Sequence, residues 1–174
     1  MRTLAAAIVA AFVFAAPAAA ATDKQRAKAV RWAVAHAGHH EIGTSNCSPL
    51  IDRWMRNMGL SARPCRAWCG AFVHEAFRQA GIDLSKRLID PDRTYDDVIA
   101  GRRGLRRIAK SAVRPGDVLL YAIRPGLKAS HMAIVRTRPS HGTVRTIEGN
   151  TSHAVRLQTR ALSYPVLAAR VTAT

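Results

Sequence analysis

The hydrophobic pattern changes near the middle of this 174-residue chain, and this change limits the fold more than any other feature. In the first half, apolar residues recur at helical spacing, as in TDKQRAKAVRWAVAHAG, where Thr22 is a candidate N-cap and Ala27, Val30 and Val34 share one face. In the second half come short β-branched segments, among them GDVLLYAI, HMAIVRT, GTVRTIEGN, AVRLQTR and PVLAARV, separated by Gly, Pro, Ser or Asn. Helices followed by a run of strands predict an α+β domain in which N-terminal helices pack on an antiparallel sheet.

Start signals mark where the helices are expected. In SPLIDRWMRNMG, Ser48 is a suitable N-cap, Pro49 fits the first helical position and Gly59 provides a stop. In WCGAFVHEAFRQAG, apolar residues follow helical spacing, so a helix is expected to begin at or near Cys69. A weaker, shorter helix is expected after Thr94, within YDDVIAG.

The N-terminal residues have the pattern of a secretory signal peptide. Arg2 provides a short positive start, the apolar run LAAAIVAAFVFAA follows, Pro17 breaks it, and the next four alanines suit a signal peptidase. We therefore expect a signal peptide over residues 1–21, with an uncleaved anchor as the alternative, and a single domain over residues 22–174. The protein would then be exported to the periplasm or outside the cell, where neighbouring cysteines usually pair.

The chain is strongly basic, with 27 Lys and Arg against 11 Asp and Glu and a formal net charge of +16. Such a charge favours an anionic neighbour, namely nucleic acid, anionic lipid or an acidic cell wall, although a solvated basic surface explains it equally well. Basic residues concentrate in GRRGLRRIAKSAVR, where Arg102, Arg103, Arg106 and Arg107 are candidates for docking to a wall polymer or lipid. Few aromatic residues interleave with this segment and no nucleic-acid motif is recognised, so specific nucleic-acid binding is not expected.

Cys69 is the candidate nucleophile. A thiol becomes nucleophilic when its thiolate is stabilised or when a neighbouring base takes its proton. The start of a helix stabilises a thiolate through unpaired N–H groups and the helix dipole, and the same groups can hold a tetrahedral oxyanion. Among the seven histidines, His131 differs from the rest because it opens the strand HMAIV directly after the polar loop RPGLKAS. There it can face a helix N-terminus packed beside the sheet.

The next strand supplies groups that could orient His131. Glu148 and Asn150, in TIEGN, are two residues apart, so in a strand they point to the same face. If this strand pairs with the one that His131 opens, Glu148 reaches the far ring nitrogen, fixes the tautomer and stabilises the imidazolium, and Asn150 assists. The alternative is that Glu148 and Asn150 only begin a turn in EGNTS.

Four ordered segments together resemble a known family: WCGAFVHEAFRQAGI, RPGDVLLYAI, SHMAIVRT and RTIEGNTS. They resemble the CHAP domain, the cysteine- and histidine-dependent amidohydrolase/peptidase family, whose wider kin are the NlpC-type papain-like cell-wall hydrolases. The chain departs from the family at Ser130, where Gly is common, and it lacks the Asp-rich calcium loop of many phage lysins before the nucleophile. The acidic segment DPDRTYDDVIAG also lacks the Gly and Glu of an EF-type loop, so we expect no metal and no cofactor.

The resemblance implies a papain-like fold and a function. It makes Cys69 the nucleophile, His131 the base, and Glu148 with Asn150 the orienting groups. It also implies a secreted enzyme that cleaves amide bonds of peptidoglycan, either the muramoyl–L-alanine bond or a peptide cross-link. We expect this enzyme to be a monomer.

The same resemblance leaves Cys47 and Cys65 to form a disulfide, because it assigns the third cysteine to catalysis. The rival pairing of Cys65 with Cys69 stays open and would make the enzyme active only after reduction. Other functions also stay open: a non-catalytic basic wall-binding protein on the same fold, a secreted nucleic-acid binder, or a hydrolase used as a toxin against rival bacteria. Because a degenerate fold should have lost the cysteine, the histidine or the acid, the presence of all three favours an enzyme.

Overall fold

The computed structural model describes residues 21–172, so the expected signal peptide lies outside the described residues except for Ala21. Its α-helices are α1 (Asp23–Ala35), α2 (Pro49–Asn57), α3 (Cys69–Gln79) and α4 (Pro91–Ile99). Two short 3₁₀ helices follow α3 and β1, namely η1 (Lys86–Ile89) and η2 (Lys110–Ala112). The strands are β1 (Leu105–Ile108), β2 (Val118–Tyr121), β3 (His131–Val135), β4 (Thr143–Thr151), β5 (Ala154–Ala161) and β6 (Leu167–Val171).

The first two helices start where their capping residues predict. Thr22 and Gln25 form a capping box at the start of α1, each side chain accepting from the other's backbone N–H. Ser48 caps α2 by accepting from the N–H of Ile51 at 3.2 Å, and Pro49 occupies the first helical position. Local sequence is therefore sufficient to set both starts.

Helix α4 begins earlier than expected, at Pro91 and not after Thr94. The reason is a cap: the carboxylate of Asp90 accepts from the N–H groups of Asp92 at 3.1 Å and Arg93 at 3.3 Å. An Asp followed by Pro is a usual helix start, and the acidic residues that follow suit the positive end of the helix dipole.

The strands form one antiparallel sheet in the order β1-β6-β2-β3-β4-β5. The sequence predicts five of them but not β1, which lies inside the basic segment and pairs with β6 from Leu105 opposite Val171 to Ile108 opposite Ala168. This strand has two arginines at its centre and only one β-branched residue, so it lacks the sequence signal by which the other strands are recognised. Charged side chains along an edge strand also discourage pairing with another chain.

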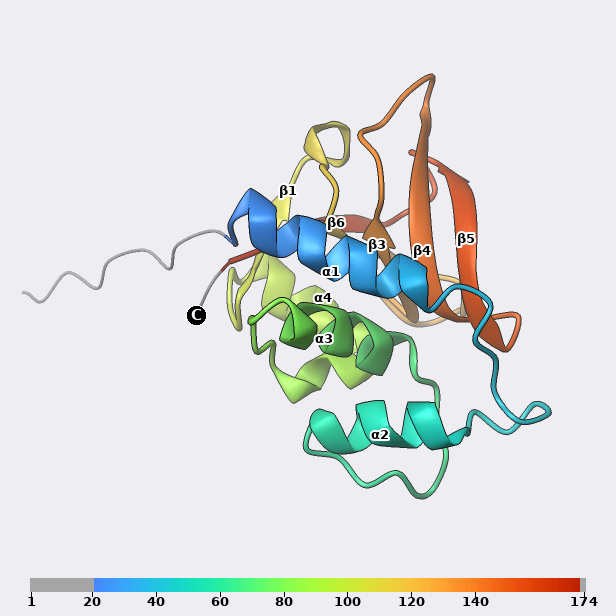
Figure 1. Ribbon diagram of the computed structural model, residues 1–174. Coiled ribbons are helices and arrows are strands. Elements are labelled where there is room, and N and C mark those ends of the chain that lie inside the picture. Colours follow the sequence, from blue (N-terminus) through green and yellow to red (C-terminus); the bar gives the residue numbers. More distant parts are fainter. Residues whose placement is uncertain (1–20, 173–174) are drawn as a thin grey trace, which may run out of the picture.

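The helices lie together on one side of the sheet, which confirms the predicted α+β arrangement (Figure 1). Helix α3 is central, because it contacts α1, α2, η1, β3 and β4. One buried cluster joins helix side chains such as Trp54 and Phe72 to sheet side chains such as Leu120 and Ile147. A smaller cluster that includes Leu119 covers the opposite face, so the strands β2 and β3 are buried on both faces.

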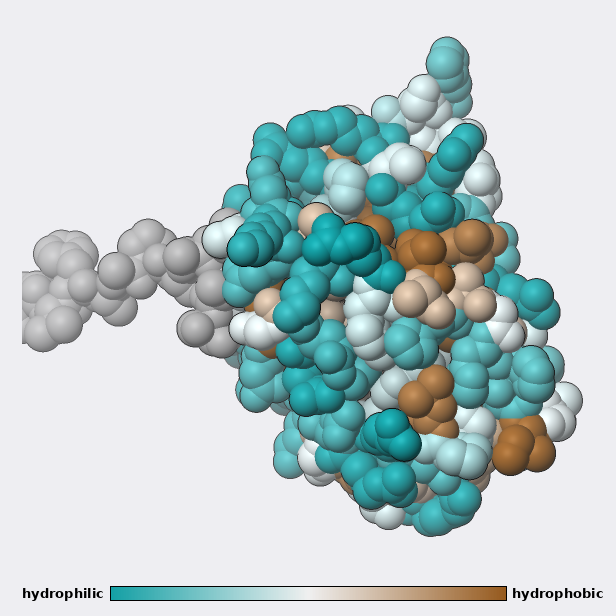
Figure 2. Space-filling view, in the orientation of Figure 1, coloured by the Kyte–Doolittle hydropathy of each residue, from teal (hydrophilic) through white to brown (hydrophobic). Residues whose placement is uncertain are grey.

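The surface is mostly hydrophilic in the face that Figure 2 shows, with separate small hydrophobic patches. Two of the exposed apolar side chains, Ile123 and Leu127, belong to the loop between β2 and β3. Within residues 21–172, no helix combines the length and the apolar character that crossing a membrane requires.

Candidate active site

Cys69 is the first residue of α3 and is buried, with 2 % of its surface exposed. Its helix has Trp68 at the N-cap position, and no side chain caps the end. The first N–H groups of a helix have no acceptor within the helix, so here they remain available to an anion. This is the position at which a thiolate and a later oxyanion are best stabilised.

His131 opens β3 and is nearly buried, at 5 % exposure. Its Nε2 lies 3.1 Å from Oε2 of Glu148 and 3.2 Å from Oγ1 of Thr151. These contacts occupy Nε2 and leave Nδ1 as the free ring nitrogen, while Cys69 is close enough to help raise the pKa of His131. The histidine therefore stands between the candidate nucleophile and a carboxylate.

Two opposing effects act on the protonation of His131. Burial disfavours the imidazolium, but hydrogen bonds and charge attraction from Cys69 and Glu148 outweigh burial and raise the pKa of His131 to about 9. At neutral pH the site thus favours an imidazolium at His131, beside the candidate nucleophile. An imidazolium at this position is an acid that can protonate a leaving amine.

Glu148 is fully buried, and both oxygens of its carboxylate accept hydrogen bonds from polar side chains. Oε1 accepts from Thr146 Oγ1 at 2.7 Å and from Arg160 Nε at 2.9 Å. Oε2 accepts from Thr151 Oγ1 at 3.0 Å and from Arg160 Nη2 at 2.6 Å, besides its contact with His131. Burial would raise the pKa of Glu148, but these partners, Arg160 foremost, lower the pKa to about 2.

Arg160 is the main residue that sequence reasoning missed. It lies on β5 and holds Glu148 through two nitrogens, a geometry typical of strong guanidinium–carboxylate pairs. Its guanidinium also lies over the rings of Tyr121 and Tyr164, 5.8 and 5.5 Å from their centroids. Strand pairing alone would not have suggested it, because the register places Arg156 opposite Glu148 and Arg160 opposite Val144.

In the described residues Asn150 makes no hydrogen bond to His131, where strand alternation had placed it. A β-bulge between Glu148 and Thr151 interrupts strand alternation, and Asn150 adopts a left-handed φ of 60°. Its amide donates to the side chain of Asn46 at 3.0 Å. The bulge brings Thr151 to the position that alternation had assigned to Asn150.

Two glycines let α3 approach its neighbours. A Cβ on Gly70 would lie 1.8 Å from the carbonyl oxygen of Leu88, so glycine is required where α3 crosses η1. A Cβ on Gly149 would lie 2.6 Å from Cβ of Phe72 and 2.9 Å from the ring of Trp68. The residue beside Glu148 is thus glycine because β4 and α3 touch there, and this contact brings the thiol to the histidine.

The structure pairs Cys47 with Cys65, and their Cα atoms are 5.6 Å apart. Cys69 is the free cysteine of the described residues. The expected disulfide is therefore present, and the rival pairing of Cys65 with Cys69 is not. The bond fixes the loop that leads into α3.

A groove with a volume of about 360 Å³ gives access to Cys69. Its lining combines apolar side chains with charged ones: Arg66, Ala67, Ile89, Asp90, Pro91, Arg124, Leu127, Ala129 and Ser130. Its size suits a short peptide segment.

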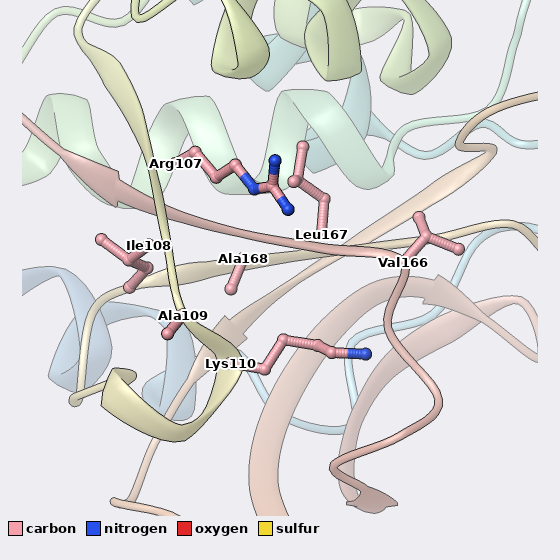
Figure 3. Close-up of a pocket in the computed structure, with 7 residues that line it drawn as sticks. All are labelled: Arg107, Ile108, Ala109, Lys110, Val166, Leu167 and Ala168. Carbon is pink, nitrogen blue, oxygen red and sulfur yellow. The ribbon is translucent and has the colours of Figure 1, made fainter.

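A larger cavity, of about 450 Å³, lies away from the thiol, where β1 and η2 meet β6 (Figure 3). Arg107 and Lys110 supply its charged groups, and Nζ of Lys110 donates to the carbonyls of Ser163 at 3.4 Å and Pro165 at 2.9 Å. Its lining residues include no thiol, imidazole or carboxylate, so it is not a candidate active site. Within residues 21–172 there is also no group of three His, Cys, Asp or Glu side chains arranged to hold a metal.

The four arginines of the basic segment differ in their surroundings. Arg102 and Arg103 lie 3.5 and 3.2 Å from the carboxylate of Asp97, which is buried. They therefore neutralise an internal charge. Arg106 and Arg107, in β1, are exposed and form no ion pair within the described part of the chain.

The sequence matches no model of a known protein family and no curated protein. Solved structures, in contrast, have a similar fold. A Staphylococcus aureus protein described as similar to a lipoprotein of the NLP/P60 family matches with a TM-score of 0.55 and 14 % identity, over 94 % of this chain and 46 % of that one. NlpC2 from Trichomonas vaginalis matches with a TM-score of 0.50 and 15 % identity, over 88 % of this chain and 48 % of that one. The chain spans about half the length of these two proteins and shares the NlpC/P60-type, papain-like fold.

Proposed function

We propose that the protein is an exported thiol hydrolase that cleaves amide bonds of bacterial peptidoglycan, as a muramoyl–L-alanine amidase or a cross-link endopeptidase of the CHAP type. One observation carries the proposal: His131 lies between a free thiol at a helix N-terminus and a buried, fully hydrogen-bonded carboxylate. The description of the Staphylococcus aureus neighbour as an NLP/P60 lipoprotein supports a site of action outside the cytoplasm.

The proposed reaction has two steps. The thiolate of Cys69 attacks the amide carbonyl carbon and forms a C–S bond, and the unpaired N–H groups at the start of α3 hold the oxyanion. Collapse of this intermediate breaks the C–N bond, and His131 donates its proton to the leaving nitrogen. A water molecule then gives a proton to His131 and attacks the thioester, which releases the carboxylic acid and restores the thiolate–imidazolium pair.

Glu148 has a positioning role in this scheme. When His131 becomes neutral in the thioester intermediate, Glu148 loses its cationic neighbour, but Arg160 still neutralises the carboxylate. Glu148 therefore does not need to take a proton itself, and His131 keeps the tautomer and orientation that the second step requires.

The test is digestion of purified sacculi, with the released fragments identified by mass spectrometry. The wild-type protein should release soluble muropeptides, and the new termini identify the bond cleaved. Cys69→Ala and His131→Ala should reduce release to background, whereas the exposed His141→Ala is a matched control that should retain activity. Wild-type activity in Cys69→Ser would exclude this mechanism, and intact sacculi with wild-type protein would exclude the function.

A further inference from the structure

The groove at Cys69 has a basic rim. Arg66 and Arg124 both line it, Arg66 from the loop before α3 and Arg124 from the loop between β2 and β3. Both side chains are exposed, and no ion pair of residues 21–172 includes either of them. Two arginines without acidic partners in the described residues thus line the space beside the thiol, and the only hydrogen bond that their guanidinium groups form there runs from Nε of Arg66 to the carbonyl of Pro64, at 3.4 Å.

The one acid of the groove does not cancel this charge. Asp90 caps α4 by accepting from two backbone N–H groups, and its other oxygen lies 3.3 Å from Nε of Arg93. Its negative charge is therefore balanced by the helix and by an arginine that does not line the groove. The remaining charge beside Cys69 is positive.

The loop that carries Arg124 is held in place. Oγ of Ser130 accepts from the N–H groups of Ile123 and Arg124, both at 3.0 Å. Oδ1 of Asp92 accepts from the N–H of Lys128 at 2.7 Å, so the far side of the loop is fastened to α4. Ser130, which departs from the family pattern, thus has a structural use: it fixes the turn that presents Arg124.

The loop that carries Arg66 is also constrained, because the preceding residue, Cys65, is joined to Cys47. Both guanidinium groups therefore extend from backbone that is fixed before a substrate arrives. Preorganised donors bind an anion with less loss of conformational entropy than donors on free loops. Guanidinium groups are especially suited to planar carboxylates.

We propose that Arg66 and Arg124 form an anion subsite that selects peptides with a free carboxylate close to the scissile amide. The apolar side chains of the groove, such as Ile89 and Leu127, would contact the peptide's aliphatic parts. This inference rests on the proposed function, because it assigns the specificity of the same thiol. The preferred substrate is then a stem peptide with unmodified carboxylates and not one whose carboxylates are amidated.

The first experiment compares two synthetic muropeptide stems, one with free carboxylates and one with the same groups as carboxamides. The wild-type protein should cleave the carboxylate form with a kcat/KM about tenfold higher, mostly through KM. In Arg66→Gln and Arg124→Gln this preference should fall toward unity, whereas Arg31→Gln, an exposed arginine on α1, should keep it. Equal rates on both stems with the wild-type protein would overturn the inference while leaving the proposed function intact. An equal loss on both stems in the arginine variants would overturn it too.

The second experiment measures binding without cleavage. Cys69→Ala is titrated calorimetrically with each stem, alone and combined with Arg66→Gln or Arg124→Gln. Tighter binding of the carboxylate stem that is lost with either arginine and weakened by salt supports the subsite, even if the wild-type protein cleaves neither stem. Binding of neither stem, or equal binding of both, refutes it.

Discussion

Replacing Arg160 by Met tests how the site keeps a buried carboxylate ionised. Glu148 has no exposed surface, and Arg160 supplies two of its hydrogen bonds. Breaking a buried ion pair from one side costs about 3–5 kcal/mol. The lowering of the pKa of Glu148 from 4.5 to about 2 is the net of burial and all its partners, and it corresponds to about 3 kcal/mol in favour of the ionised form. Since His131 remains in Arg160→Met, we expect a loss of about 2–3 kcal/mol in the free energy of unfolding at pH 7.

The pH dependence separates charge from packing. Because the pKa of Glu148 is lower in the folded state, its contribution is present above pH 4.5 and is lost as the pH falls toward about 2. The difference between wild type and Arg160→Met should therefore shrink over that interval. Urea unfolding at pH 7 and near pH 2 measures it.

Two further variants serve as controls. Arg156→Met changes an exposed arginine of the same strand that forms no ion pair within the described residues, so its effect should stay within about 0.5 kcal/mol. The double variant Arg160→Met/Glu148→Gln removes the buried charge and should recover part of the loss. A loss for Arg160→Met that is the same at both pH values would mean that its contacts with Tyr121 and Tyr164 carry the stability, and the electrostatic reasoning would be wrong.

Three other predictions concern the supports of the site. Gly149→Ala should lower the free energy of unfolding by about 1–3 kcal/mol and reduce activity on sacculi, because the added Cβ would lie 2.6 Å from Phe72. Urea unfolding measures the first effect and a digestion assay the second. A variant with full stability and full activity would contradict the contact. Alkylation before reduction, followed by peptide mapping, should label only Cys69, whereas a label on Cys47 would show that the other pairing forms in solution. Replacing Arg106 and Arg107 by Gln should weaken sedimentation with cell walls at low salt and leave cleavage of a small soluble peptide unchanged; equal losses on both substrates would contradict a docking role.

Local sequence patterns predict much of the fold. The caps at Thr22 and Ser48 and the change from helical spacing to short β-branched segments predict the helices, most of the strands and their layer arrangement. The same patterns place Cys69 at a helix start and His131 at a strand start. These are properties of single elements, which neighbouring residues determine through capping, spacing and turns.

The register of β4 and β5 is different, because no local pattern determines it. The bulge after Glu148 and the two-residue turn at Ser152 and His153, both with left-handed φ angles, set which side chains face the histidine. These turn residues are not the Asn-Gly pair by which a two-residue hairpin turn is usually predicted. Alternation alone therefore selected Asn150, whereas the sheet placed Thr151 beside His131 and brought Arg160 to Glu148.

The sequence by itself thus determined the candidate nucleophile, the candidate base and the acid, because each stands at a position that short-range pattern identifies. The tertiary structure decided what surrounds them. Arg160 is 12 residues from Glu148 along the chain and stands opposite Val144 on the next strand, so only the folded positions of the two side chains reveal the contact. Arg66 and Arg124 likewise come from loops that are separated in sequence and meet only where α3 packs against the sheet. Contacts of this kind depend on bulges, turns and close helix–sheet packing, whose free energies arise between segments and are not encoded in any one of them.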